Sequence, residues 1–331
     1  MRNINYEESK HVLGFKAANI REFESGIVVE NKDMTVFTIH SKTNLKVLYK
    51  EKIAYRNIWI TKNHLCIQDK TSNLHLYSFH LILNSNESLK VEKRLLLKEV
   101  NVRIFKYPYV LTKDGIWSLF DVRNGQDLFL LNRIQLEPNR FYNTLMNDNY
   151  LLFFDFLNII VYHLVDLTKP PLILENNSKN LELYEHLLFS VGNNSIICYD
   201  LQNQKRTEIV LWKELLWIQF IHSFVILEHL MQMKTLYRWN EDYSQLKFVC
   251  ELEHDFEFSL ECNNPWILSW PDKFGNITIY SKNFREISSF QLLKKPISYC
   301  VDKKLPRIYY LENTYNLVMI DFTIDSSFSL L

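Results

Sequence analysis

Four carboxylates near the C-terminal quarter of the chain are spaced so that they could do chemistry together. Glu251, Glu253, Asp255 and Glu257 alternate by two, so on a β-strand their side chains would share one face. Crowded carboxylates can bind a divalent cation or act as general acid and base. The alternative is a solvated outer strand, whose charge prevents a further strand from adding to the sheet. We favour this second interpretation.

The ten histidines of the sequence do not form a metal-ligand pattern. His75 and His80 are five residues apart, so on one strand they point to opposite faces. His222 and His229 are no better placed. The sequence also lacks a nucleophile elbow, a phosphate-binding glycine loop and a dinucleotide fingerprint. We therefore expect no enzyme, no catalytic residue, no cofactor, no metal and no small-molecule ligand.

The most concentrated basic cluster lies near the C-terminus and supplies the candidate partner-binding residues. It could dock an acidic protein segment or a phosphate backbone, whereas the alternative is an ordinary solvated loop face. Lys plus Arg equals Asp plus Glu at 38 each, so a nucleic acid could bind only through such a local patch. The candidate residues are Lys294, Lys295, Lys303, Lys304 and Arg307.

A sequence pattern recurs about every 40 residues and predicts the elements that position these residues. An apolar strand is followed by a polar turn, then by a short strand that ends in an aromatic residue beside a polar one. Repeats of this length that consist of strands are typical of β-propellers. The clearest copies are residues 115–125, 195–203 and 276–283.

The repeat divides the chain into eight units, and we expect an all-β protein with a single β-propeller of seven or eight four-stranded blades, eight being favoured. Seven blades would result if the first and last units shared one ring-closing blade, which would hide two edge strands. No linker rich in Pro, Gly or Ser separates the units, so residues 11–331 are expected to form one propeller after an N-terminal extension of residues 1–10. The units cover residues 11–50, 54–99, 101–137, 139–177, 180–213, 215–253, 255–294 and 296–331.

Strand boundaries follow from apolar runs and polar clusters. In the first unit we expect strands at 12–17, 26–30, 35–40 and 45–49. In the fourth we expect 151–156, 159–164 and 172–174, and in the last 297–301, 307–311, 317–322 and 327–331. Blades cover each other, so inner strands should be continuously apolar. Residues 208–213 and 245–254 alternate and fit the outermost strand.

Glycine is scarce, with six residues in 331, so most turns must use other residues. We expect Asn, Asp, Lys and Ser to take the left-handed turn positions. Asp114-Gly115 and Asn124-Gly125 are the strongest hairpin signals. The five cysteines are scattered singly and are expected to be buried and reduced, which indicates a cytoplasmic or nuclear protein. The N-terminus has no apolar signal segment, and no apolar run is long enough to span a membrane.

The chain resembles the WD-repeat propeller family in a divergent form. Phe120-Asp121 and Tyr199-Asp200 match the aromatic-Asp pair that closes the third strand of that repeat. Ile39-His40, Trp239-Asn240 and Tyr280-Ser281 depart from it, and the Gly-His dipeptide of the family is missing. Members of the family typically act as non-catalytic platforms for protein assembly, and the resemblance implies that role here.

Several functions follow as hypotheses. The first is a non-catalytic scaffold, a propeller subunit of an intracellular complex that binds one or more proteins. Alternatives are a substrate-receptor subunit of a ubiquitin ligase and an accessory subunit of an RNA-modifying enzyme. A propeller enzyme of the lactonase or glycosidase type is the least favoured, because the sequence lacks catalytic motifs.

Overall fold

The computed structural model describes two compact units of β-structure. Unit 1 comprises Met1–Val100 and Asp255–Leu331, unit 2 comprises Asn101–His254, and each is described by itself. Every regular element among the described residues is a strand, so none of them offers a helix long and apolar enough to cross a membrane. The described residues are 6–61, 63–82, 87–123, 129–136, 142–176, 178, 180–192, 194–211, 215–221, 224–229, 234–240, 245–252, 266–268, 276–281, 286–292, 296–302, 305 and 307–322.

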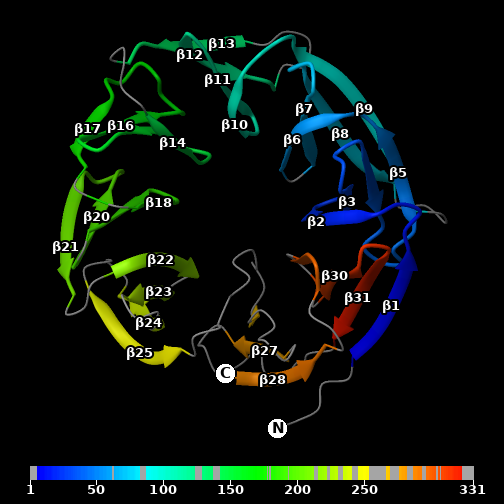
Figure 1. Cartoon of the computed structure of the whole chain (residues 1–331). Coiled ribbons are helices and arrows are strands. Elements are labelled where there is room, and N and C mark those ends of the chain that lie inside the picture. Colours follow the sequence, from blue (N-terminus) through cyan, green and yellow to red (C-terminus); the bar gives the residue numbers. More distant parts are fainter. Residues whose placement is uncertain are drawn as a thin grey trace. The chain divides into compact units, whose positions relative to one another are not determined.

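Unit 1 contains four antiparallel sheets in its described residues (Figure 1). Three have four strands and one has three. They consist of β2 (Ala17–Phe23), β3 (Gly26–Asn31), β4 (Val36–His40) and β5 (Val47–Lys52); of β6 (Tyr55–Ile60), β7 (His64–Asp69), β8 (Leu74–Ile82) and β9 (Ser88–Leu97); of β26 (Trp266–Leu268), β27 (Asn276–Ser281) and β28 (Glu286–Gln291); and of β1 (Tyr6–Val12), β29 (Tyr299–Val301), β30 (Arg307–Asn313) and β31 (Asn316–Phe322).

Unit 2 contains four further sheets of four antiparallel strands, each formed by consecutive segments. They consist of β10 (Val102–Lys106), β11 (Tyr109–Asp114), β12 (Ile116–Asp121) and β13 (Phe129–Ile134); of β14 (Asn143–Met146), β15 (Tyr150–Phe154), β16 (Asn158–His163) and β17 (Leu172–Glu175); of β18 (Asn180–Tyr184), β19 (Leu187–Val191), β20 (Ser195–Asp200) and β21 (Lys205–Val210); and of β22 (Leu215–Ile221), β23 (Phe224–His229), β24 (Lys234–Trp239) and β25 (Leu246–Leu252).

Burial follows the position of a strand within its sheet. All five residues of β19, and Tyr150–Phe153 of β15, are buried, because neighbouring sheets cover both faces of these second strands. The fourth strands β17 and β21 alternate between exposed and half-buried residues along their length. The outer strands expected at 208–213 and 245–254 overlap with β21 and β25, the fourth strands of their sheets, but β21 begins three residues earlier than expected and ends at Val210.

Aromatic side chains fill the space between neighbouring sheets within each unit. In unit 1, Phe37 of β4 meets Tyr77 of β8 at a centroid distance of 5.8 Å. In unit 2, Trp117 of β12 meets Phe153 of β15 at 4.9 Å. Burying one such side chain contributes roughly 1.5–3 kcal/mol. The sheets of each unit are therefore held together by apolar cores that two sheets share.

The two ends of the chain meet in one sheet of unit 1. Strand β1 pairs antiparallel with β31, from Tyr6 opposite Phe322 to Val12 opposite Asn316. The structure thus places residues 6–10 in a strand where we expected an extension, and the first inner strand is β2 at Ala17–Phe23 rather than 12–17. The free edge of β31 explains this, because its backbone groups need a partner. The fourth strand expected at 327–331 lies outside the described residues.

Left-handed backbone falls on residues other than those expected. Gly115 has a φ of 80°, which confirms the Asp114-Gly115 turn, whereas Asn124-Gly125 lies outside the described residues. Among the described residues, the other positions with positive φ are Met34, Leu45, Ser72, Glu99, Glu185 and Gln204, and of these only Ser72 is of a predicted type. Asn and Asp act through their side chains instead: Asp69 Oδ1 accepts the backbone N–H of Thr71 and of Asn73, each at 2.9 Å.

Two of the five cysteines are fully buried thiols, as expected. Cys66 and Cys198 lie in the cores, and burial raises the pKa of both, that of Cys198 to about 12. Cys250 and Cys300 are also free thiols but are only partly buried. Cys262 lies outside the described residues. The expectation of one continuous domain over residues 11–331 stays a prediction.

Candidate functional site

A pocket of about 630 Å³ lies at one end of three successive sheets of unit 2. In an antiparallel sheet of four strands, the first and third connections lie at the same end. The pocket is lined by the first connections of sheets β10–β13, β14–β17 and β18–β21 and by the third connections of the last two. The topology therefore brings five polar turns together, although up to 96 residues separate them, from Lys106 to Gln202.

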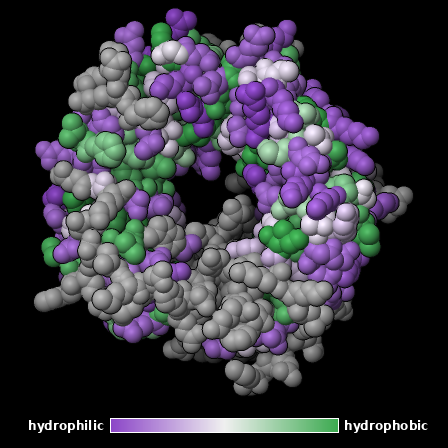
Figure 2. Space-filling model, in the orientation of Figure 1, coloured by the Kyte–Doolittle hydropathy of each residue, from purple (hydrophilic) through white to green (hydrophobic). Residues whose placement is uncertain are grey.

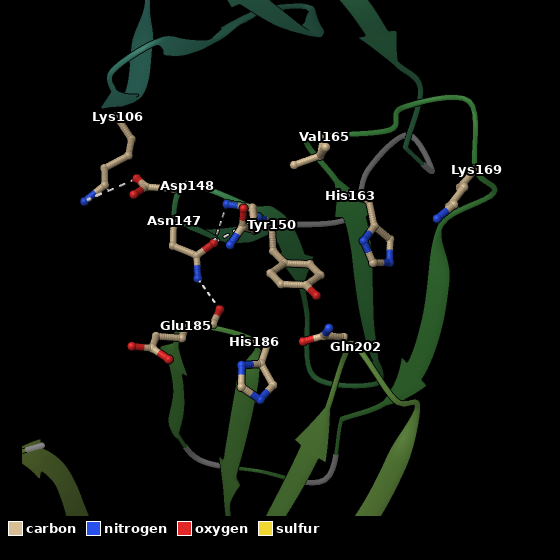
Figure 3. A pocket seen from close by; sticks show the side chains of 11 residues that line it. Lys106, Asn147, Asp148, Tyr150, His163, Val165, Lys169, Glu185, His186 and Gln202 are labelled. Atoms are coloured by element: carbon tan, nitrogen blue, oxygen red, sulfur yellow. Dashed lines mark hydrogen bonds and ion pairs between the residues drawn. The ribbon is translucent and has the colours of Figure 1, made fainter. Parts of the chain in front are cut away.

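One side of the pocket carries charged residues and a bridge between two sheets. Lys106 Nζ lies 4.0 Å from Asp148 Oδ1. Asn147 accepts the backbone N–H of Tyr150 at 2.9 Å and donates through Nδ2 to the carbonyl oxygen of Glu185 at 2.6 Å. These contacts fix the β14–β15 turn against the β18–β19 turn (Figure 3). We call this side, which Lys106, Asp148 and Glu185 line, the acidic rim.

The other side surrounds the side chain of Tyr150, which is only 5% exposed. Its hydroxyl points into the space between His163, His186 and Gln202 (Figure 3). Tyr150 and His163 are cross-strand partners in β15 and β16, and their rings lie 4.9 Å apart. Lys169 lies beyond His163 on the β16–β17 connection. We call this side, with Tyr150, His163, His186, Gln202 and Lys169, the donor side.

The Tyr150 hydroxyl is protonated at neutral pH. Burial raises its pKa, and the nearby carboxylate of Asp200 raises it further. The hydroxyl has no hydrogen-bond partner among the residues that the structure describes. It can therefore donate a hydrogen bond to a molecule in the pocket.

The predicted basic cluster is described at one residue only. Lys294, Lys295, Lys303 and Lys304 lie outside the described residues. Arg307 is in β30, where its Nε donates to Asp321 Oδ2 at 2.7 Å and its Nη1 donates to the carbonyl oxygen of Lys42 at 3.1 Å. Its guanidinium is thus bonded within unit 1, and its role in partner binding stays a prediction.

The other residues that could do chemistry are separated by the fold. Glu251 is exposed on the outer strand β25, whereas Glu253, Asp255 and Glu257 lie outside the described residues. His75 Nε2 lies 2.8 Å from Asp69 Oδ2, and His80 is exposed on the same strand. His229 is buried, with Nε2 2.8 Å from Thr235 Oγ1, and His222 is not described. Among the described residues, no three His, Cys, Asp or Glu side chains are grouped to hold a metal ion.

A second feature of unit 2 is an exposed apolar turn between β15 and β16. Phe156 is 93% exposed and Leu157 is 62% exposed. Asp155 Oδ1 accepts the backbone N–H of Leu157 and of Asn158, each at 2.8 Å. The backbone N–H of Asn176 donates to the Leu157 carbonyl at 2.8 Å, and the Asn176 amide donates to the carbonyl of Asp155. The turn is therefore held rigidly while its two apolar side chains face solvent.

Sequence reasoning missed this turn because it placed Phe156 inside the strand 151–156. Strand β15 ends at Phe154, since the Asp155 side chain takes up the N–H groups that would continue the ladder. The available signal was Asp155 followed by two apolar residues and then Asn158, which is an Asx turn with an apolar tip. Tyr150, His163 and His186 carried no such signal, because only the fold brings them together.

Comparisons with known proteins agree on the fold. No protein-family model matches the chain, and no curated protein matches its sequence. Among solved structures, Sqt1 of Chaetomium thermophilum bound to the N-terminus of the ribosomal protein L10 is 10% identical, with a TM-score of 0.58 over 94% of this chain and 98% of that one. The WD40 domain of SCAP from fission yeast is 13% identical, with 0.56 over 96% and 97%.

BamB from Moraxella catarrhalis is 11% identical, with a TM-score of 0.55 over 97% of this chain and 99% of that chain. At this identity the likeness shows the fold alone. Together with the eight sheets in the described residues, it defines an all-β, eight-bladed β-propeller. The predicted similarity to WD-repeat propellers is confirmed at this level, and so is the preference for eight blades. We expected the two chain ends to share a blade only in a seven-bladed propeller. The structure instead has eight sheets in its described residues, and β1 and β31 from the two chain ends pair in one of them.

Proposed function

We propose that the protein is a non-catalytic interaction subunit that binds another protein through the apolar turn between β15 and β16. The single observation that carries this proposal is the 93% exposure of Phe156 on a turn fixed by hydrogen bonds. A large apolar side chain that stays in contact with water does not contribute the free energy that its burial would provide. A partner with an apolar pocket would recover roughly 1.5–3 kcal/mol by covering it.

The rigidity of the turn strengthens this proposal. Binding costs free energy when flexible side chains and loops must be ordered, and a pre-formed turn avoids much of that cost. Aromatic residues that fill a partner pocket are typical anchors of protein interfaces. Among the coloured residues on the face that Figure 2 shows, hydrophilic and hydrophobic residues are interspersed, as on an ordinary protein surface.

The structural comparisons support the general kind of function. Sqt1, a propeller of similar fold, is bound in its structure to the N-terminus of a ribosomal protein. We further propose that the protein is a subunit of a multiprotein complex in the cytoplasm or nucleus. A second contact with a partner would use the basic residues Lys294, Lys295, Lys303 and Lys304. The free thiols of Cys66 and Cys198 favour such a reducing compartment.

Purification of the tagged protein from its own cells tests the proposal. We expect a protein partner in stoichiometric amount with the wild-type chain and its loss with Phe156→Ser. Tyr315→Ser is the matched control, because Tyr315 is an aromatic residue, 51% exposed, in the corresponding turn between β30 and β31. Both substitutions are at the protein surface, so each should change the free energy of unfolding by no more than about 0.5 kcal/mol.

Two results would count against the proposal. Absence of any stoichiometric partner would contradict the interaction function itself. Equal recovery of a partner with Phe156→Ser and with Tyr315→Ser would remove the β15–β16 turn as its binding surface. A photo-cross-linking amino acid at position 156 would identify the partner residue in contact.

A further inference from the structure

We infer that the pocket of unit 2 binds a carboxylate, carried by an Asp or Glu side chain in a peptide segment of a partner protein. The inference rests on the proposed function only in that the occupant belongs to a protein. The pocket uses the first and third connections of its sheets, whereas the Phe156 turn is the second connection of sheet β14–β17. The two sites therefore lie at opposite ends of that sheet and can be tested separately.

The first observation is the unpartnered hydroxyl of Tyr150. The side chain is buried, yet among the described residues nothing accepts its proton, and the hydroxyl points into the pocket (Figure 3). The hydroxyl can therefore donate to an acceptor oxygen placed in the pocket, and a carboxylate oxygen would make that hydrogen bond charge-assisted.

The second observation is that the groups around this hydroxyl are donors. A neutral imidazole of His163 or His186 donates one N–H and accepts at its other nitrogen, and the Gln202 amide donates two N–H groups. Lys169 carries a positive charge, and its Nζ lies 3.8 Å from Asp166 Oδ2. The nearby carboxylate of Asp200 is already engaged, because its Oδ1 accepts the backbone N–H of Gln202 and of Asn203, each at 3.0 Å. A carboxylate has two oxygens and about four acceptor positions, so it can use several of these donors at once.

The third observation is the acidic rim, which selects among anions. Asp148 and Glu185 lie on the other side of the pocket, and Lys106 Nζ lies 4.0 Å from Asp148 Oδ1. A polyanion such as RNA would be repelled by this side. A peptide with one acidic residue would instead offer its backbone N–H groups to these carboxylates. The volume of about 630 Å³ is in the usual range for ligand pockets and admits one side chain with its neighbouring backbone.

A titration observed at the histidines tests the inference. The probe is the pentapeptide Gly-Gly-Glu-Gly-Gly with blocked ends, and its control is the same peptide with Gln in place of Glu. The protein is the full chain with ¹³C-labelled histidine, and its ten histidines give a simple spectrum. We expect the signals of His163 and His186, assigned with His163→Gln and His186→Gln, to shift with the Glu peptide only.

Two variants separate binding from folding. Tyr150→Phe removes only the hydroxyl, and we expect the Kd for the Glu peptide to rise at least tenfold, since hydrogen bonds to charged groups contribute about 1.5–3 kcal/mol. Gln202→Glu places a carboxylate on the donor side at an exposed turn, and we expect it to abolish binding. Tyr162→Phe is the control, because Tyr162 lies in the same sheet but does not line the pocket.

Several results would overturn the inference. One such result is that the His163 and His186 signals do not shift with the Glu peptide up to its solubility limit, and another is that they shift equally with the Gln peptide. A third is that Tyr150→Phe and Tyr162→Phe bind the Glu peptide with equal affinity. Shifts produced by an RNA oligomer and lost in Tyr150→Phe would also overturn it, in favour of a nucleic-acid site. Glu-peptide binding without any stoichiometric cellular partner would contradict the proposed function alone. A cellular partner that is lost in Phe156→Ser, without any Glu-peptide binding, would contradict this inference alone.

Discussion

His40 shows how a single side chain couples this fold to pH. It lies at the end of β4 with no exposed surface, and its Nδ1 lies 2.8 Å from the carbonyl oxygen of Leu45. Its Nε2 lies 2.8 Å from Thr38 Oγ1, and the ring of His11 is 5.2 Å away. A neutral imidazole with the proton on Nδ1 donates to Leu45 and accepts from Thr38, so this environment favours the uncharged form.

We predict that this histidine makes the protein less stable as the pH falls below 6.5. Burial lowers the pKa of His40 from 6.5 to about 4, and repulsion from His11 adds to the effect. Between these values the unfolded chain binds a proton here and the folded chain does not, so the free energy of unfolding falls with decreasing pH. The expected contribution between pH 7 and pH 5 is about 2 kcal/mol.

Urea unfolding at several pH values checks this prediction. His40→Asn should remove most of that pH dependence, whereas His80→Asn, at an exposed position of β8, should retain it. A pH dependence that is the same in His40→Asn and in the wild-type protein would show that other groups cause it.

At the scale of one element, strand β1 completes the sheet that contains the other end of the chain. Its seven residues pair with β31, and Lys10 forms an ion pair with Glu312. Without β1, the edge of β31 would carry unpaired backbone groups, which destabilise the sheet and invite pairing with other chains. This strand therefore contributes both stability and protection from aggregation.

Truncation tests the contribution of β1. A chain that begins at Leu13 should lose at least about 3 kcal/mol of stability, given about 0.5–1.5 kcal/mol for each lost ladder hydrogen bond. It should also aggregate at lower temperature, measured by light scattering during thermal unfolding. A chain that begins at Tyr6 is the control. Equal unfolding midpoints of the two chains would mean that the pairing of β1 with β31 contributes little.

At the scale of the whole molecule, one pairing is far more distant in sequence than the others. Seven sheets form from consecutive strands, so their contacts are local. The sheet with β1 instead joins Tyr6 to Phe322. Closing such a long loop costs entropy before any contact repays it, and distant pairings slow folding.

Circular permutation should therefore accelerate folding. Linking residue 331 to residue 1 and opening the chain between Lys98 and Glu99, which lie between β9 and β10, makes all the pairings local. We expect this permutant to refold faster than the wild-type protein in stopped-flow experiments. Opening the chain between Ser72 and Asn73, inside the β7–β8 turn, is the control, because it makes another sheet non-local. Equal refolding rates for both permutants would contradict the argument.

The sequence predicted much of the fold, because strand signals are local. The Asp114-Gly115 hairpin, the continuous burial of inner strands such as β19 and the outer positions of β21 and β25 all follow from apolar spacing and turn residues. Local signals misplaced the end of β15 at Phe156 and the first inner strand at 12–17. There, a side-chain hydrogen bond of Asp155 and the distant partner β31 decided the outcome.

By itself, the sequence determined the β class and the repeat, and it favoured eight blades over seven, because each blade forms from about 40 consecutive residues whose pattern is local. Only the tertiary structure decided where β1 pairs and which turns of unit 2 gather around Tyr150. The same holds for the part of the Phe156 turn that Asn176 holds, through its side-chain hydrogen bond to the carbonyl of Asp155. Such features depend on contacts between residues far apart in sequence, and those contacts leave no periodic signal in the chain.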